Sequence, residues 1–282
     1  MNAMTAATAM SARTVNAAVD VLIPTRNRAC ALAVTLAALS AQTLRPARII
    51  ISDQSDGPGP FVTAEHAALA RYLEVAGIEC IARRHLPRRG MAEQRAFLLS
   101  LAEAPYCLFL DDDVMLEPDL LERLCRAMHE QECGFVGSAL HGLSYLDDRR
   151  PAQQHIELWD GNVGPEHIVP GSVEWERHHL HSAANLFHVQ QSLGLASGDT
   201  RCYRVAWVGG CVLFDTQKLR SCGGFDFWQQ LPPDHCGEDV HAQLRVMRRF
   251  GGCAIIPSGA YHMELPTTVL TRDVDAPKVL AP

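Results

Sequence analysis

Three consecutive aspartates, Asp111, Asp112 and Asp113, are the residues whose types and spacing point most directly to chemistry. Adjacent carboxylates repel one another, and this repulsion destabilises the fold unless a positive charge neutralises them. A divalent cation with a phosphate ligand suits such hard oxygen donors. In an extended backbone alternate side chains share a face, so Asp111 and Asp113 can converge while Asp112 points away. The alternative is a solvated turn that caps the next helix, for which one carboxylate would suffice.

The triplet follows an apolar run, YCLFL at 106–110, which predicts a buried strand ending at the ligand-binding edge of an open α/β sheet. Strands and helices alternate before it and just after it. We expect strands at 19–24, 48–52, 78–82, 106–110 and 134–140, and helices at 29–42, 63–76, 90–102 and 118–130. This order predicts an α/β fold with a mostly parallel sheet and helices on both faces.

The alternation stops near residue 141, and the stretch to 200 is rich in His, Trp, Gly and Pro. One helix is expected there, at 183–193. Beyond it the pattern predicts one long strand at 203–214, interrupted by glycines, then a helix at 240–250 and a strand at 253–257. The tail beyond Thr267 looks irregular.

Composition narrows the class of protein. The chain has 282 residues, 48% of them hydrophobic and 20% charged, which is typical of a globular protein with a sizeable core. A net charge of −7 argues against a general nucleic-acid binder. Ten cysteines, many in apolar contexts and none in a CxxC pair, favour a reducing compartment. We find no signal peptide and no membrane-spanning window, so we expect a cytoplasmic protein, peripheral to the membrane at most.

Six sequence segments occur in a characteristic order. They are IPTRNR at 23–28, ISDQSDG at 51–57, a basic stretch ending at Arg95, LDDDV at 110–114, VGGCVLF at 208–214 and GEDVHAQLR at 237–245. This ordered set resembles glycosyltransferase family 2, inverting enzymes with the GT-A fold, over roughly residues 19–262. The resemblance implies a Rossmann-like GT-A sheet with a smaller acceptor-side region. It divides the chain into an arm (1–18), a nucleotide-sugar-binding half (19–140), an acceptor-binding and catalytic half (141–265) and a tail (266–282).

The resemblance places a nucleotide-diphosphate sugar, with UDP expected, at the first two motifs. Pro24, Thr25 and Arg26 would lie along the nucleotide, although a plain strand-to-helix turn is the alternative. Asp53 would accept a hydrogen bond from the base, which a charged acceptor makes strong; an Asp that merely starts a turn is the alternative. Arg89 and Arg95 would grip the diphosphate, because Arg can form two parallel hydrogen bonds to it. A solvated surface suffices for the other basic residues here, Arg83, Arg84 and Arg88.

For the acidic triplet, the resemblance assigns the metal to Asp113 and ribose or supporting contacts to Asp111 and Asp112. Mn²⁺ or Mg²⁺ is the implied cofactor, since these ions prefer oxygen ligands. His262 stands where some family members supply a further metal ligand, although a lone His is more often structural.

The GED motif carries the implied general base. Asp239 would take the proton from the acceptor hydroxyl, and Glu238 would hold the acceptor. The alternative is a helix-start charge that only stabilises the helix. Gly209 and Gly210 would let the acceptor approach closely, or form a β-bulge. Trp207 could offer its aromatic face to a sugar, or pack in the core.

The His-rich stretch fits no standard zinc spacing and lacks Cys partners, so we favour an acceptor-side loop and helix over a second metal site. Its cluster comprises Trp175, His178, His179, His181 and His188.

The sequence therefore predicts a metal-dependent inverting glycosyltransferase that acts on a saccharide, lipid-linked or other hydroxyl acceptor. Polysaccharide or glycolipid assembly is the usual setting of such enzymes. A sugar-phosphate nucleotidyltransferase is a second hypothesis, weakened because the loop at 25–28 contains no Gly. A non-catalytic nucleotide-sugar-binding module is a third. The transferred sugar, the linkage and the oligomeric state stay open.

Overall fold

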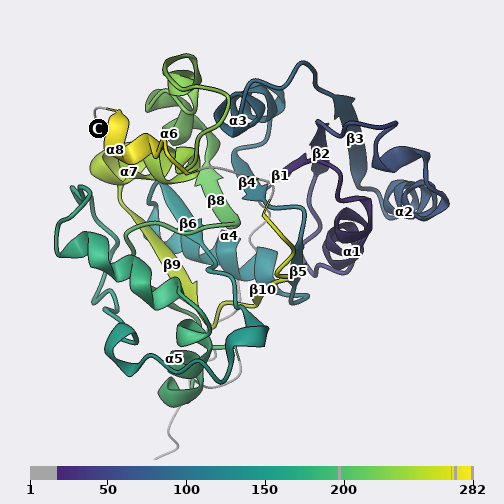
Figure 1. Ribbon diagram of the computed structural model, residues 1–282. Helices are drawn as coiled ribbons and strands as arrows, with labels where there is room; N and C mark the ends of the chain where they lie inside the picture. The colour runs from purple at the N-terminus through teal and green to yellow at the C-terminus, as the bar shows by residue number, and fades with distance from the viewer. Residues whose placement is uncertain (1–17, 196–197, 268, 270–271, 281–282) are drawn as a thin grey trace, which may run out of the picture.

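The computed structural model describes residues 18–195, 198–267, 269 and 272–280, so the expected N-terminal arm lies almost wholly outside the described residues. Its centre is an eight-stranded sheet with the strand order β3-β2-β1-β4-β8-β6-β9-β7 (Figure 1). The strands are β1 (Val19–Thr25), β2 (Arg48–Asp53), β3 (Glu79–Arg84), β4 (Tyr106–Leu110), β6 (Phe135–Gly137), β7 (Arg201–Tyr203), β8 (Cys211–Asp215) and β9 (Gly252–Ile256). A separate antiparallel ribbon pairs β5 (Val114–Leu116) with β10 (Ala260–His262).

Only β7 and β8 run against the other strands of the sheet. β1 is parallel to β2 and β4, β2 is parallel to β3, and β6 is parallel to β9. β8 is antiparallel to both β4 and β6, and β7 is antiparallel to β9. The predicted α/β fold with a mostly parallel sheet is confirmed.

Helices cover both faces of the sheet. They are α1 (Ala29–Ser40), α2 (Ala64–Val75), α3 (Met91–Leu101), α4 (Leu120–Gln131), α5 (Asn185–Leu193), α6 (Thr216–Ser221), α7 (Glu238–Phe250) and α8 (Ala276–Val279). Short 3-10 helices are η1 (Pro60–Val62), η2 (Leu143–Tyr145), η3 (Pro151–Gln153), η4 (Glu174–His181) and η5 (Asp226–Gln230).

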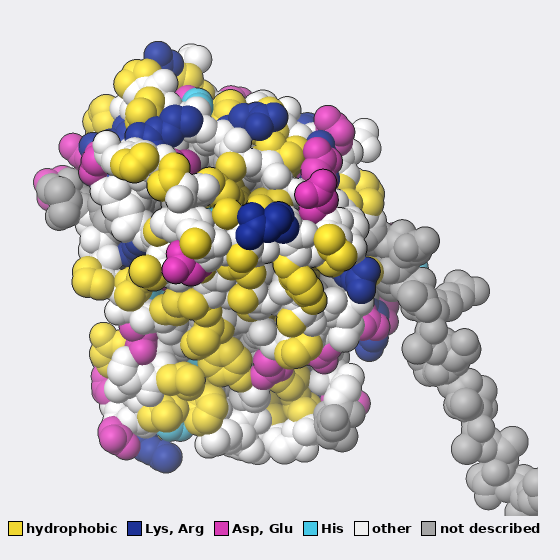
Figure 2. Space-filling view, turned by 90° about the vertical axis from the view of Figure 1, so that its right-hand side faces the viewer, with side chains coloured by type: hydrophobic (Ala, Val, Ile, Leu, Met, Phe, Trp, Pro, Cys, Tyr) yellow, Lys and Arg dark blue, Asp and Glu magenta, His cyan; other side chains and the backbone are white. Residues whose placement is uncertain are grey.

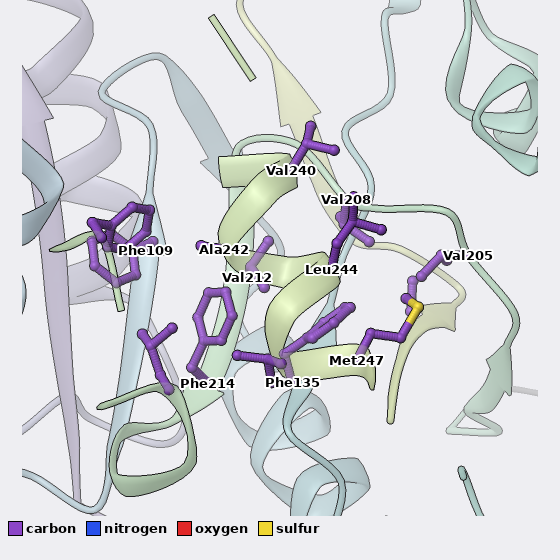
Figure 3. Close-up of a cluster of buried hydrophobic side chains, with 14 of the residues drawn as sticks. Phe109, Phe135, Val205, Val208, Val212, Phe214, Val240, Ala242, Leu244 and Met247 are labelled. Atoms are coloured by element: carbon purple, nitrogen blue, oxygen red, sulfur yellow. The ribbon is translucent and has the colours of Figure 1, made fainter. Parts of the chain in front are cut away.

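Two hydrophobic clusters, one on each face, follow from the alternation of side chains along the strands. Leu108 of β4 belongs to the cluster that packs against α1 and α4. Phe109, the next residue, belongs to the cluster that packs against α3 and α7. Figure 3 shows the second cluster around α7, which contributes Val240, Leu244 and Met247 to it. Because both faces are covered, the central strands read as continuous apolar runs.

The expectation of one strand over 203–214 is wrong. β7 ends at Tyr203 at the sheet edge, and β8 begins at Cys211 beside β4. The segment between them crosses to the middle of the sheet, where the carbonyl of Gly210 accepts a hydrogen bond from the Asp111 amide, 2.9 Å away. Three-residue β5 and β10 were not expected, and α8 lies in the tail that looked irregular.

The molecular face that carries α1, α2 and β3 mixes hydrophobic, basic and acidic side chains (Figure 2). Val34, Val62, Tyr72 and Val75 are exposed there. Within the described ranges, no helix is both long and apolar enough to span a membrane.

Candidate active site

The carboxyl ends of β1, β2 and β4 meet at one edge of the sheet. In the parallel register Thr25 lies opposite Asp53, so two of the residues predicted to bind the nucleotide are neighbours. β4 pairs with the other side of β1, which brings the acidic triplet to the same edge. The sheet therefore gathers motifs that are far apart in the sequence, as the strand-end argument predicted.

Asp112 points into the protein and is anchored there. It is 5% exposed; Thr25 Oγ1 donates a hydrogen bond to its Oδ2 at 2.6 Å, and Arg28 Nη1 lies 3.2 Å from Oδ1. Burial raises the pKa of Asp112 to about 6, while Thr25 and Arg28 oppose that shift. These contacts tie the loop after β1 to the acidic triplet, which gives Asp112 a supporting position beneath the edge.

Asp113 and His262, the two residues predicted to bind the metal, lie together. Asp113 is 2% exposed, and its Oδ2 lies 3.5 Å from His262 Nε2. The β5–β10 ribbon sets this approach, because His262 pairs with Val114 and the Asp113 carbonyl accepts a hydrogen bond from Met263 N. Burial raises the pKa of the Asp113 carboxyl, whereas the neighbouring His262 and Arg28 lower it.

The donor set fits a divalent ion that is shared with a substrate phosphate. No group of three or more His, Cys, Asp or Glu side chains in the described parts of the chain could enclose a metal on its own. Mg²⁺ and similar ions are often held by one or two protein ligands and completed by phosphates and water. Asp113 and His262 supply that number.

Arg28 is a functional candidate that the sequence analysis missed. Its Nη1 lies 2.7 Å from Asp113 Oδ2, and its Nη2 donates to the Pro266 carbonyl at 2.5 Å. The guanidinium therefore supplies the positive charge that the triplet was expected to need, and also holds the segment after β10. The signal was present in the TRNR motif, but only the fold shows that this arginine, rather than Arg26, reaches the triplet.

Asp53 is held by Arg84, for which the sequence alone predicts a solvated surface position. It is 5% exposed; Arg84 Nη1 lies 2.8 Å from its Oδ2, and the Ser55 amide donates to Oδ1 at 2.8 Å. The β2–β3 register explains the contact, since Asp53 pairs with Arg84. Beside it, Gln54 is 4% exposed and its Nε2 has no partner among the described residues.

The other predicted donor-side residues lie in two loops. Arg26 forms an ion pair with Asp56 at 3.1 Å, which links the loop after β1 to the loop after β2. Pro24 is buried near the end of β1. Arg89 lies exposed between β3 and α3.

Gly59 packs against the Asp53 carboxylate, so a substitution at Gly59 tests the role of Asp53 and its loop. A Cβ at Gly59 would lie 2.4 Å from Asp53 Oδ2, and its φ of +84° disfavours any other residue, whereas a Cβ at Gly57 would meet nothing within 4 Å. We expect Gly59→Ala to destabilise the protein by about 1–2 kcal/mol, from backbone strain alone. We also expect it to weaken nucleotide-sugar binding. Gly57→Ala is the matched control, and thermal melting with calorimetric titration measures both effects.

Equal behaviour of the two Gly variants would contradict this role of the loop. A loss of stability without any loss of nucleotide-sugar affinity would show that Asp53 and its loop contribute to folding alone.

The GED motif lies opposite the triplet, and one arginine joins the two. Arg95 of α3 is 6% exposed. Its Nε lies 3.0 Å from Glu238 Oε1 at the start of α7, and its Nη2 lies 3.2 Å from Asp111 Oδ1. Two nitrogens of Arg95, Nε and Nη2, thus contact carboxylates, and the expected contact of this side chain with a diphosphate stays a prediction.

Asp239 lines a small pocket between α3, α7 and the sheet. Arg95, Phe109, Gly210 and Gln243 are among the other lining residues. Burial raises the pKa of Asp239 to about 7, the charges of Glu238 and Asp111 act in the same direction, and Arg95 acts against them. A carboxyl with such a pKa can accept a proton near neutral pH.

The predicted acceptor residues lie along the segment that leads to Gly210. A Cβ at Gly209 would meet nothing within 4 Å, whereas one at Gly210 would lie 3.2 Å from Asp111 Oδ2. The indole of Trp207 stacks on His178 with ring centroids 4.8 Å apart, and Trp175 lies 4.5 Å away. One face of Trp207 is therefore already covered.

Two other histidines of the cluster, His181 and His188, make ordinary contacts within the fold. His181 Nε2 lies 3.0 Å from the Tyr203 hydroxyl, and burial lowers its pKa to about 4. His188 Nε2 lies 3.0 Å from the Leu146 carbonyl. These contacts agree with the preferred interpretation of the stretch as loop and helix.

Comparisons with known proteins identify the family and the fold of the chain. The family model for glycosyl transferase family 2 matches residues 20–208. Searching the curated proteins gave no match. Among solved structures, S. aureus TarS is similar with a TM-score of 0.52 and 13% identity, over 87% of this chain and 36% of that one. A complex of TarS 1–349 with UDP-GlcNAc gives 0.53 and 12%, over 89% and 60%. The chain thus spans well under two thirds of TarS, and the likeness shows the GT-A fold alone.

Proposed function

Because this chain belongs to glycosyl transferase family 2 and is a glycosyltransferase, we propose that it transfers a sugar from a nucleoside-diphosphate sugar to a hydroxyl acceptor with inversion. One observation carries the proposal furthest. Arg95 joins Asp111, beside the expected donor, to Glu238, next to the expected general base. Two acidic motifs that lie far apart in the sequence are therefore joined through one side chain.

The donor nucleotide is proposed to bind at the ends of β1 and β2, along Pro24, Thr25 and Arg26. There Asp53 offers a carboxylate acceptor, and Gln54 offers a buried amide donor for which the described part of the chain holds no partner. An imide edge, such as that of uracil, presents one N–H donor next to carbonyl acceptors and matches this pair. A UDP-sugar is accordingly the first candidate.

The diphosphate and ribose are proposed to lie over the triplet, with Asp111 and Asp112 in ribose or supporting contacts. Asp113 and His262 would hold Mn²⁺ or Mg²⁺ together with the phosphates. When bound, the ion would neutralise the charge that develops on the leaving nucleoside diphosphate. Arg89, exposed in the loop between β3 and α3, and Arg95 are the arginine candidates for a phosphate contact.

Asp239 is proposed as the general base. Its carboxylate would accept the proton of the acceptor hydroxyl as that oxygen bonds to the anomeric carbon and the bond from this carbon to the diphosphate breaks. A pKa raised to about 7 by burial and by Glu238 favours this role near neutral pH. Glu238, fixed by Arg95, would support the acceptor from the same helix end.

The acceptor is proposed to approach past Gly209, where a side chain would have open space. We expect Gly209→Leu to raise the KM for the acceptor about tenfold or more, because the added side chain would occupy that space; a loss of about 1.4 kcal/mol suffices. Binding of the nucleotide sugar should not change. The matched control is Gly164→Leu, because a side chain at Gly164 would also have open space. Gly161 is unsuitable, because its positive φ would strain any other residue.

Steady-state kinetics with varied acceptor measure this effect. An unchanged acceptor KM in Gly209→Leu would move the acceptor path elsewhere. His178 already covers one face of the Trp207 ring. The proposed contact of Trp207 with the acceptor therefore requires that the acceptor takes the path past Gly209.

Two alternative functions predict reactions that differ from sugar transfer. A sugar-phosphate nucleotidyltransferase would release pyrophosphate from a nucleoside triphosphate and a sugar phosphate, but the loop at 25–28 lacks the Gly residues that cradle a triphosphate. A non-catalytic module would bind nucleotide sugars without transfer or hydrolysis. We further propose polysaccharide or glycolipid assembly as the setting of the transferase.

A panel of nucleotide sugars, screened by thermal shift with and without Mn²⁺, tests the proposal. We expect UDP-sugars to raise the melting temperature most, adenine nucleotides, which lack an imide edge, to raise it least, and Mn²⁺ to enlarge the shift. Hydrolysis or transfer assays on the best ligand then separate an enzyme from a binding module. Stabilisation by nucleoside triphosphates with pyrophosphate release would support the nucleotidyltransferase instead.

A further inference from the structure

Arg95 is the buried cation between the two acidic motifs, and its surroundings define what it can do. Its guanidinium lies 5.7 Å from the centre of the Phe109 ring, and the pocket wall also includes Phe214 and Phe225. Burying a cation among aromatic side chains is costly unless carboxylates compensate for the lost hydration. Glu238 and Asp111 provide this compensation, one through Nε and the other through Nη2.

We propose that Arg95 is a positioning residue for the transfer reaction: its planar guanidinium sets Glu238 and Asp111 in one fixed arrangement and thereby keeps Asp239 ionised and directed at the acceptor. This inference rests on the proposed function. Lys could supply the charge but cannot reproduce the rigid fork that joins two carboxylates on different elements.

The charges that face Asp239 come from three elements. Glu238 lies on α7 itself, Asp111 follows β4, and Arg95 extends from α3. The two carboxylates favour the protonated form of Asp239, and Arg95 is the opposing positive charge. Removal of Arg95 therefore leaves three carboxyl groups without their shared cation, and the proton on Asp239 becomes harder to lose.

The sign of the effect follows directly. A general base works in its ionised form, so transfer declines below its pKa. In Arg95→Met the pKa of Asp239 rises, and the acidic limb of the kcat/KM profile moves to higher pH. In Glu238→Gln one like charge is removed while the side chain can still bind Arg95, so the limb moves to lower pH. Arg95→Lys keeps the charge and leaves the limb near that of the unchanged protein.

The experiment measures kcat/KM between pH 5.5 and 9 for these three variants and the unchanged protein. We expect the limb of Arg95→Met to move up by one pH unit or more, with the rate deficit about tenfold smaller at high pH than at low pH. Arg95→Lys should restore the limb but only part of the plateau, because the fork is lost. Calorimetric binding of UDP with Mn²⁺ should be within about threefold of the unchanged protein in Glu238→Gln, which leaves the residues proposed to bind the nucleotide in place.

Several outcomes would overturn the inference. A uniform rate loss at all pH values in Arg95→Met, with an unshifted limb, would reduce Arg95 to a structural residue. If Arg95→Met does not fold, Arg95→Lys decides alone: a retained limb with a plateau below that of the unchanged protein supports the inference, and a full plateau overturns it. Absence of transfer in the unchanged protein, with intact UDP binding, would overturn the proposed function and this inference with it, whereas transfer with unshifted limbs overturns the inference alone.

Discussion

Asp239→Asn is expected to lower kcat for sugar transfer by about 10²–10⁴-fold, the range that a positioned general base contributes. The amide cannot accept the acceptor proton, yet it has nearly the shape of the carboxyl group. The fold should not suffer, because burial already raises the pKa of Asp239 and makes its ionised form costly. We therefore expect the melting temperature at neutral pH to stay equal or rise. Single-turnover transfer of a radiolabelled sugar measures the effect directly.

Binding controls separate chemistry from recognition in this variant. The dissociation constant of UDP or the best donor should change by less than about threefold, since Asp239 is proposed to act on the acceptor and not on the nucleotide. Asp234→Asn, an exposed acid in the loop before α7, is the matched control and should transfer normally. Full activity of Asp239→Asn would assign the base to another group, for which Glu238→Gln is the next variant to assay.

The first half of the fold was predictable because its strands are short, apolar and separated by helices of ordinary length. Expected strands at 19–24, 48–52 and 106–110 match β1, β2 and β4 almost residue for residue. A strand buried on both faces leaves a continuous apolar run, and such runs are easily located. The order of elements then implied the parallel sheet, and the sheet implied that its strand ends carry the site.

The second half was less predictable for a physical reason. Residues 203–214 are apolar except for Arg204, and apolar content alone cannot tell one buried strand from two strands joined by a buried crossing segment. Val208 shows the difficulty: it is fully buried, but Gln243 of α7 binds both its N–H and its carbonyl through the side-chain amide, so it pairs with no strand there. Such a side-chain partner can be found only after the helix has been placed.

The sequence indicated which residues belong to the site more readily than it indicated which residues contact one another there. The acidic triplet, Asp53 and the GED motif were chosen from the sequence, and the fold brings them to one region. Arg28, Arg84 and Arg95 illustrate what was missing, because a long side chain can reach any of several carboxylates. The β2–β3 register fixes the contact of Arg84 with Asp53, and the packing of α3 against α7 fixes that of Arg95. Neither the strand register nor the helix packing can be predicted from a local sequence pattern.

Asp113→Asn is the prediction with the second largest expected effect. We expect transfer to fall by at least about 10²-fold, because an amide is a poor ligand for the cation that would offset charge on the leaving diphosphate. The increase in melting temperature caused by Mn²⁺ with UDP should disappear. The ligand-free protein should not lose stability, since burial raises the pKa of Asp113 and its ionised form is costly in the fold. Thermal melting with and without Mn²⁺, and the transfer rate, measure all three effects.

The combination of outcomes is diagnostic, because a structural role and a metal-binding role predict opposite changes in the ligand-free protein. A structural Asp113 would serve mainly as the partner of Arg28, so its removal would leave a half-buried guanidinium with fewer hydrogen bonds and lower the melting temperature. A metal ligand would leave that temperature unchanged or raise it while abolishing the response to Mn²⁺. Asp160→Asn, an exposed acid far along the chain, controls for the loss of one negative charge. A retained response to Mn²⁺ in Asp113→Asn would remove this residue from the metal site and leave its ion pair with Arg28 as its main role.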